Sequence, residues 1–177
     1  IHLACMSFFE LVRPAGVPSP VIVEVPHAGL AIPEQVADEL IAPKESLMRD
    51  ADPWVDTLFE QAPSVGATLL VAKVSRYVVD LNRSATDVDP LAVVNANGAQ
   101  SVGGRGVIWR IATDGAPVLR RPLSAERYAS RLALFYEPYH ALLGELITET
   151  VARHGYAILL AGHSMPSMGR DVRGGPI

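Results

Sequence analysis

The chain alternates short apolar runs with longer amphipathic stretches. Residues 21–25 form a β-branched run between two prolines, which predicts a strand buried on both faces. Residues 67–74 predict a second strand, residues 77–81 its continuation or a third strand, and residues 156–161 the last one. Because helical patterns separate these runs, the sequence predicts an α/β domain of stacked layers.

Two shorter helices are predicted in the first half of the chain. The first covers residues 34–41 and has Pro33 at its first turn, where a missing N–H costs nothing. The second covers residues 52–62, with Asp52 as a candidate N-cap and Pro53 at the first helical position. Both would connect predicted strands.

One long helix is predicted in the second half of the chain. It begins after Ser124, a suitable N-cap, and its apolar side chains recur at helical spacing as far as Val151. Gly155 is suited to end it. Pro138 lies inside the stretch and should kink or divide the helix.

The segment between the strands and the long helix lacks a regular period. Residues 82–106 are rich in small and polar residues and predict a long loop, a feature that is often functional in compact domains. Residues 107–111 and 117–119 flank Asp114–Gly115, which predicts a small hairpin.

Composition and length fit one globular domain. The chain has 177 residues, of which 49% are hydrophobic, enough for a sizeable core. The predicted domain covers residues 6–177. Met6 is a suitable natural start, so residues 1–5 are expected to be upstream sequence or an added tag.

Charge and apolar content argue against several classes of function. A formal net charge of −4 gives no electrostatic reason to bind nucleic acid or an anionic membrane. No apolar run approaches the roughly 18 residues of a membrane span, and the N-terminus lacks the pattern of a signal peptide. The single cysteine, Cys5, allows no intrachain disulfide. We expect a cytoplasmic protein that acts on a small molecule, with its oligomeric state left open.

Two of the five histidines follow predicted strands directly. His27 and His163 are each followed by small residues, and in open α/β sheets functional sites form beyond the carboxyl ends of strands. The pair fits either a metal site or two structural histidines. His140 fits a packed position on the long helix, and His154 fits stabilisation by the dipole of that helix.

A catalytic zinc site commonly takes two histidines and a carboxylate and keeps its fourth position open. Asp52 is the first candidate for the carboxylate and Asp56 the second. Both also fit capping or charge compensation at a helix N-terminus.

Polar side chains gather in residues 75–83, at the end of a predicted strand. Arg76, Asp80, Asn82 and Arg83 lie close together in this segment. Guanidinium groups bind carboxylates in a fork and stabilise oxyanions. The alternative is an exposed Arg–Asp pair, which contributes little to stability.

Five motifs together resemble the N-formylglutamate amidohydrolase family, over residues 20–177. The most specific one is Ser-Arg-Tyr-Val-Val-Asp-Leu-Asn-Arg at residues 75–83. The others, in the order typical of that family, are residues 25–29, 50–54, 138–140 and 162–166. The chain is more distantly similar to zinc carboxypeptidases and aspartoacylase.

The resemblance implies a three-layer α/β domain with a mixed, largely parallel central sheet. It implies hydrolysis of the amide bond of an N-formyl or other N-acyl amino acid, converting N-formyl-L-glutamate and water to L-glutamate and formate. It also implies zinc or another divalent metal. The resemblance implies His27 and His163 for the metal, Arg76 for the oxyanion, and Asn82 and Arg83 for the α-carboxylate. We assign Asp52 as the third metal ligand, with Asp56 as the alternative. Arg110 and Arg105 are our candidates for a second carboxylate.

The chain departs from the relatives at two positions. Carboxypeptidase-like enzymes have a glutamate ligand three residues after the first histidine, where this chain has Leu30, so the third ligand must come from elsewhere. The resemblance also implies a glutamate general base in the C-terminal part of the family. No carboxylate matches that position, and Glu24 fits a structural role better. We therefore expect the 177-residue chain to be a poor catalyst by itself.

Two other functions remain open from the sequence. One is a different zinc deacylase or carboxypeptidase-like hydrolase built on the same framework. The other is a metal-binding or ligand-binding protein without catalysis.

Overall fold

A four-stranded sheet forms the centre of the molecule. The computed structural model describes residues 8–95, 99–100 and 103–165. The strand order is β1-β3-β2-β6, with β1 at Phe9–Val12, β2 at Val21–Val25, β3 at Thr68–Ala72 and β6 at Ile158–Ala161. Strand β2 pairs in parallel with β3 and β6, whereas β1 pairs antiparallel with β3. The predicted mixed, largely parallel sheet is confirmed.

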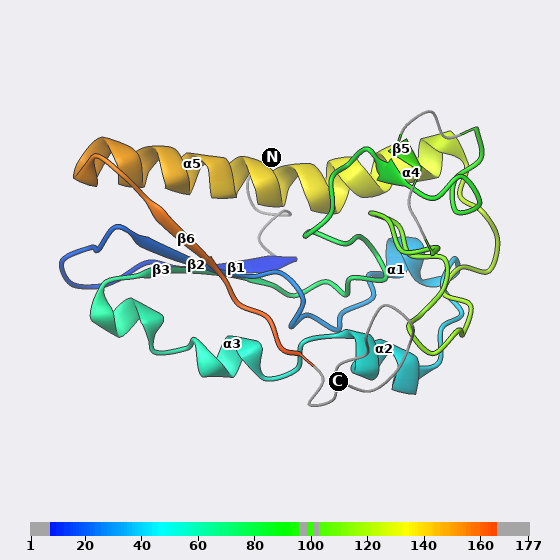
Figure 1. Ribbon diagram of the computed structural model, residues 1–177, viewed down its shortest axis with the longest axis horizontal. Coiled ribbons are helices and arrows are strands. Elements are labelled where there is room, and N and C mark those ends of the chain that lie inside the picture. Colours follow the sequence, from blue (N-terminus) through cyan, green and yellow to red (C-terminus); the bar gives the residue numbers. More distant parts are fainter. Residues whose placement is uncertain (1–7, 96–98, 101–102, 166–177) are drawn as a thin grey trace.

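One long helix covers a face of this sheet (Figure 1). It consists of α4 (Ala125–Arg131), a π-helical turn η3 (Leu132–Tyr136) and α5 (Glu137–His154). The Ser124 side chain caps it by accepting a hydrogen bond from the Arg127 amide, and Gly155 ends it at φ 82°, as the sequence predicts. Pro138 lies just after the π turn, where the regular helix resumes.

Helix α3 (Val55–Leu58) lies against the opposite face, which makes three layers. Apolar side chains of β2 and β3 alternate between the two faces, as expected for strands that are covered on both sides. Those on the side of the long helix include Ile22, Leu70, Phe135, Tyr139 and Leu146; those on the side of α3 include Val23, Val25, Val55, Leu69 and Val71.

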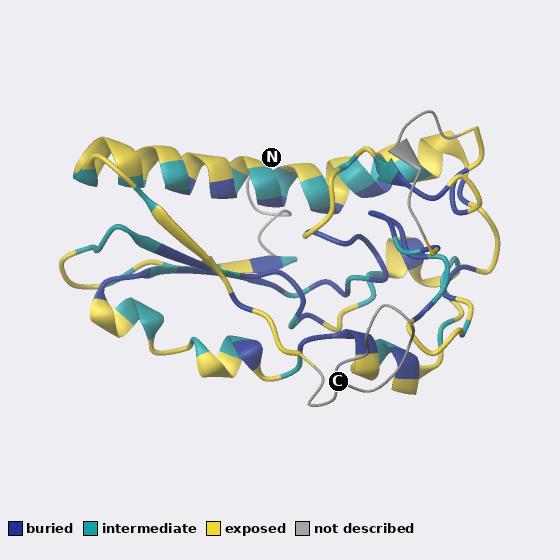
Figure 2. Cartoon of the chain, in the orientation of Figure 1, coloured by how far each residue is buried: buried dark blue, intermediate teal, exposed yellow. Residues whose placement is uncertain are grey.

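Strand β6 differs from the rest of the sheet in its exposure (Figure 2). All four of its residues are exposed, and Ile158, Leu159 and Leu160 keep 48%, 42% and 41% of their surface accessible. In β3, by contrast, four of the five residues are buried. The strand that carries His163 at its end is therefore held mainly through its pairing with β2.

The predicted helix at residues 52–62 is wrong in its start and its length. Helix α3 begins at Val55 after Trp54, which has φ 70°, and no side chain caps it. A 3₁₀ turn, η2 (Ala62–Val65), follows separately. The Asp52 carboxylate does not cap a helix because it contacts His163 and Ser164 instead.

Other short elements also differ from the expectation. The predicted helix at residues 34–41 is reduced to the single turn α1 (Glu34–Ala37), which Pro33 precedes as N-cap. Helix α2 (Lys44–Asp50) and strand β1 were not predicted, since their short patterns carry little periodic signal.

Residues 77–81 form turns, not the predicted strand. The long loop after them is confirmed; its described residues include the two-residue strands β4 (Asp87–Val88) and β5 (Ala99–Gln100). The turn at Asp114–Gly115 is confirmed by a bridge between Ile111 and Pro117, although no regular hairpin forms. Within the described ranges, no helix combines the length and apolar character needed to cross a bilayer.

Candidate metal centre and active site

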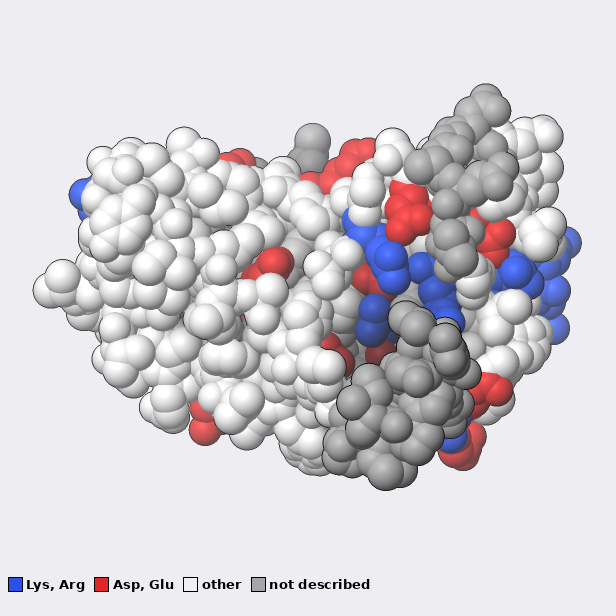
Figure 3. Space-filling model, in the orientation of Figure 1, with Lys and Arg blue, Asp and Glu red and all other residues white. Residues whose placement is uncertain are grey.

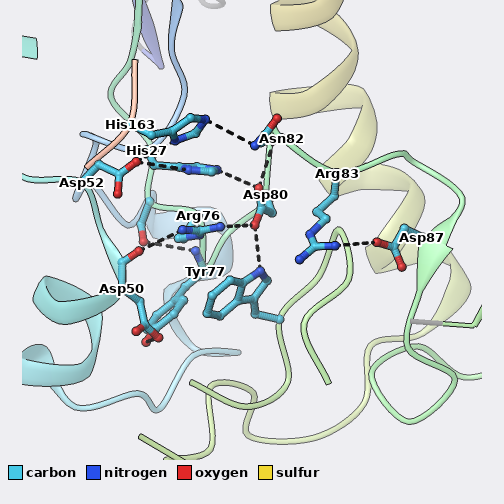
Figure 4. Close-up of polar contacts among 12 residues, drawn as sticks. His27, Asp50, Asp52, Arg76, Tyr77, Asp80, Asn82, Arg83, Asp87 and His163 are labelled. Carbon is cyan, nitrogen blue, oxygen red and sulfur yellow. Dashed lines mark hydrogen bonds and ion pairs between the residues drawn. The ribbon is translucent and has the colours of Figure 1, made fainter. Parts of the chain in front are cut away.

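Three side chains meet beyond the carboxyl ends of β2 and β6 (Figure 4). His27 follows β2, Asp52 follows α2, and His163 follows β6. Potential ligand atoms of the three residues all lie within 4.8 Å of one another. Parallel strands place their carboxyl ends at one edge of a sheet, which explains why residues so distant in sequence come together.

The two nitrogens of the His27 ring have different environments. Nε2 lies 2.8 Å from Oδ1 of Asp80, while Nδ1 is buried and has no hydrogen-bond partner within the described part of the chain. Nδ1 faces Oδ2 of Asp52 at 3.6 Å. Burial by itself lowers the pKa of His27, but the nearby carboxylates of Asp52 and Asp80 outweigh burial, so the pKa is raised overall.

Asp52 joins the two histidines. Its Oδ2 lies 2.8 Å from Nδ1 of His163, and its Oδ1 accepts a hydrogen bond from the Ser164 hydroxyl at 3.1 Å. Burial opposes ionisation, yet the contacts with His27 and His163 outweigh it and lower the pKa of Asp52 to about 2. The carboxylate is therefore charged at neutral pH, as a metal ligand must be.

Asn82 contacts the other side of the His163 ring. Its side-chain nitrogen lies 3.3 Å from Nε2 of His163. An amide can present either a donor or an acceptor, so Asn82 can pair with either tautomer of this ring. The rings of His27 and His163 lie 5.0 Å apart, centroid to centroid.

Asp80 is the buried centre of the polar network. It accepts hydrogen bonds from Arg76 at 2.7 Å, from the Trp109 indole at 2.9 Å and from the main-chain N–H of Asn82 at 3.0 Å, besides its contact with His27. Burial would raise its pKa, but hydrogen bonding from His27 and the charge of Arg76 lower it further than burial raises it. Because Asp80 is fully buried, the alternative of an exposed Arg–Asp pair is wrong.

Arg76 is fixed on several sides. Besides Asp80, it donates to the main-chain oxygen of Asp50 at 3.1 Å, and its guanidinium lies 4.4 Å from the centroid of the Trp109 ring. Asp50 is itself held through its carboxylate, which accepts from the Tyr77 hydroxyl at 2.7 Å and the Thr113 amide at 2.9 Å. The Nε atom of Arg76 is buried and has no hydrogen-bond partner among the residues described.

The other candidate arginines are each placed by a neighbouring group. Arg83 pairs with Asp87 at 3.3 Å, and Arg110 pairs with the nearly buried Asp89 at 2.8 Å. Arg105 lies over the Trp109 ring, 5.9 Å from its centroid. Lys and Arg side chains gather near the middle of this face of the molecule, with acidic side chains among them (Figure 3).

Two further carboxylates were considered for the site, Asp56 as a metal ligand and Glu24 as a general base. Asp56 accepts a hydrogen bond from the Thr57 amide and lies outside the group formed by His27, Asp52 and His163. Glu24 accepts a hydrogen bond from the Tyr139 hydroxyl at 3.1 Å, which fits the structural role expected for it.

Trp109 is a part of the site that sequence reasoning did not find. It lies in a predicted strand, and in the structure its indole donates to Asp80 while its ring packs against Arg76. A tryptophan next to two arginines, Arg105 and Arg110, was the only available signal.

Comparison with known proteins decides between the families that share such a site. Residues 19–176 match the sequence profile of the N-formylglutamate amidohydrolases. The chain belongs to this family. It is 33% identical to an N-formylglutamate deformylase from Pseudomonas aeruginosa and 32% identical to one from Pseudomonas putida, each over 150 residues. These matches include 84% of this chain and 53% and 52% of the relatives, so the chain spans about half of their length.

Solved structures agree with the family assignment. The crystal structure of an N-formylglutamate amidohydrolase from Ralstonia eutropha JMP134 superposes with a TM-score of 0.80 at 33% identity, over 90% of this chain and 57% of that one. A protein from Agrobacterium tumefaciens, 19% identical, has a TM-score of 0.66 over 89% of this chain and 56% of its own, which shows the fold alone.

Proposed function

We propose that this chain carries the metal-binding part of an amidohydrolase that converts N-formyl-L-glutamate and water to L-glutamate and formate. The observation that carries the proposal is the group of His27, Asp52 and His163, in which the buried Nδ1 of His27 has no hydrogen-bond partner among the residues that the structure describes. A buried ring nitrogen without a partner is costly unless a ligand satisfies it.

The donor set fits a divalent metal of the zinc type. Two imidazoles and one carboxylate form a common catalytic set with an open fourth position. The contact between His27 and Asp80 is the carboxylate–histidine arrangement that orients metal-binding histidines, since a proton on Nε2 leaves the Nδ1 lone pair free. When bound, such a metal supplies a Lewis acid that acidifies water and polarises an amide carbonyl.

The remaining side chains bind and orient the substrate in this proposal. Arg76 directs its guanidinium, held by Asp80 and Asp50, at the oxygen that becomes negative when water adds to the amide. Asn82 and Arg83 hold the α-carboxylate, and Arg110 or Arg105 holds the second one. The names of the Pseudomonas relatives support formylglutamate as the substrate.

Metal removal tests this function directly. The protein is dialysed against a chelator, and formate release from N-formyl-L-glutamate is measured before and after zinc, cobalt or manganese is returned. The P. aeruginosa deformylase serves as the positive control. We expect the weak activity of this chain to disappear when metal is removed and to return with it, and His27→Ala and His163→Ala to bind less metal. Wild-type metal content in both variants would contradict the site.

The same assay separates the two alternative functions. A carboxypeptidase-like or other deacylase activity would release product from acetylated or peptidic substrates in preference to formylated ones. A non-catalytic binding protein would bind metal without releasing formate, even at high protein concentration.

A further inference from the structure

The long helix holds the main chain of the candidate substrate-binding segment, residues 77–85, through three side chains. Arg131 donates to the main-chain oxygen of Val78 at 2.9 Å and of Tyr77 at 3.4 Å. The Tyr136 hydroxyl donates to the main-chain oxygen of Arg83 at 2.8 Å. The Tyr128 hydroxyl donates to the main-chain oxygen of Ala85. Because the segment forms no regular strand or helix, these hydrogen bonds help to hold its main chain in place.

The π turn explains how Arg131 and Tyr136 reach the same segment. In an α-helix, residues five positions apart point about 140° away from each other. In η3 the Glu137 amide bonds to the oxygen of Leu132, five residues back. Such a turn brings residues five apart towards one face, and π turns of this kind often occur at functional sites. The added residue thus lets Arg131 and Tyr136 both face residues 77–85.

Arg131 is itself firmly held. It is 1% exposed, and it pairs with Glu39 through two nitrogens, at 2.6 Å and 3.1 Å. A buried guanidinium needs such a partner, since an unpaired charge would be strongly unfavourable. The helix side of the contact is therefore rigid, and the segment that it holds carries Asp80, Asn82 and Arg83.

We propose that Tyr136 and Arg131 are positioning residues for substrate recognition, with Tyr136 setting the place of the Asn82–Arg83 pair and Arg131 the place of Asp80. The inference rests on the proposed function, because it assigns Asn82 and Arg83 to the substrate carboxylate. The Tyr136 phenol acts on Arg83 through the main chain and does not touch the substrate. Burial raises its pKa, so the hydroxyl remains a donor throughout the neutral range.

Tyr136→Phe tests the role of Tyr136 because it removes one oxygen and little volume. We expect KM for N-formyl-L-glutamate to rise about fivefold to tenfold, which is the effect of one lost hydrogen bond, while kcat and bound metal stay near wild type. Tyr156→Phe, at an exposed position after the long helix, is the matched control and should change neither constant. If Tyr136→Phe leaves KM as Tyr156→Phe does, or lowers kcat with KM unchanged, the proposal is overturned.

A graded pair of variants separates positioning from general loosening. Tyr128→Phe removes a similar bond two residues beyond Arg83, so its effect on KM should be smaller than that of Tyr136→Phe. Arg131→Lys keeps the charge but cannot serve Glu39 and two main-chain oxygens together. We expect it to weaken metal binding through Asp80 as well as raise KM. Equal effects of Tyr128→Phe and Tyr136→Phe on KM would overturn the assignment.

Hydrogen exchange gives a readout that does not need activity. The Arg83 amide bonds to the main-chain oxygen of Asp80 at 3.2 Å, and its exchange should become faster in Tyr136→Phe but not in Tyr156→Phe. Unchanged exchange in Tyr136→Phe overturns the positioning role, even in an active enzyme. If the wild-type protein releases no formate, the proposed function fails. Faster exchange of the Arg83 amide in Tyr136→Phe would still support the positioning role in that case.

Discussion

Oδ1 of Asp80 lies 2.8 Å from Nε2 of His27, and both side chains are almost fully buried. The contact leaves Nδ1 as the only nitrogen of that ring that can face Asp52 and His163. A buried aspartate thus determines the direction in which the first candidate ligand presents its lone pair.

Asp80→Asn is expected to weaken metal binding without removing a ligand. An amide can donate as well as accept, so it no longer fixes the proton on Nε2 of His27, and the loss should be about 10- to 100-fold in zinc affinity. Competition with a chromophoric chelator measures it. Asp87→Asn, which alters the more exposed pair with Arg83, is the control. Similar affinities for the two variants would argue against the role of Asp80.

Arg76→Lys should lower kcat far more than it raises KM. Lysine keeps the charge but cannot bond to Asp80 and the Asp50 oxygen together while lying flat on Trp109. If Arg76 stabilises the oxyanion, kcat should fall by about 10²- to 10³-fold. Steady-state formate release at equal metal content is the measurement. Arg49→Lys, at an exposed surface pair, serves as the control, and a kcat equal to that control would remove Arg76 from this role.

Arg110→Ala is expected to reduce the preference for an acidic substrate side chain. A hydrogen bond to a charged group contributes about 1.5–3 kcal/mol, so the ratio of kcat/KM for N-formyl-L-glutamate over N-formyl-L-glutamine should fall at least tenfold. Arg121→Ala provides an exposed arginine as control. A ratio that stays at the wild-type value would indicate that Arg105, and not Arg110, binds the second carboxylate.

Gly29→Ala should destabilise the fold next to the candidate metal site. A Cβ at Gly29 would lie 2.3 Å from the main-chain carbon of Lys73, a contact that neither chain segment can accept without moving. We expect a loss of about 1–3 kcal/mol or more in the free energy of unfolding, measured by urea denaturation. Gly144→Ala is an informative control, because it has open space within α5 and should stabilise by about 0.5–1 kcal/mol.

The sequence predicted the large elements of the fold because each has a strong local signal. The β2 and β3 runs, the Ser124 cap and Gly155 all act on their immediate neighbours, and the structure confirms them. The failures occurred where tertiary contacts override local preference. Asp52 has the local properties of an N-cap, yet two histidines from distant strands hold its carboxylate.

The candidate site was only partly predictable for the same reason. His27 and His163 could be found because strand ends are visible in the sequence. The partner of His27, by contrast, is Asp80, 53 residues away, and its local context indicates only a pair with Arg76. Trp109 was missed because its roles, donating to Asp80 and packing against Arg76, depend on tertiary contacts. Such contacts leave no periodic pattern in the sequence. The ligand roles of His27, Asp52 and His163 remain predictions for the metal analysis to test.

The position of His163 at the end of the last described strand has a consequence for synthesis. Asp52 and His163 are 111 residues apart, and ribosomes add about 5–20 residues per second, so the second histidine follows by roughly 5–20 s. During that interval the nascent chain can already form the contact between His27 and Asp80, while His163, the third residue of the candidate metal group, has not yet been synthesised. Metal capture is therefore expected to be a late event that follows docking of β6 onto β2, and a ribosome stalled before residue 163 should present a chain with much weaker zinc affinity.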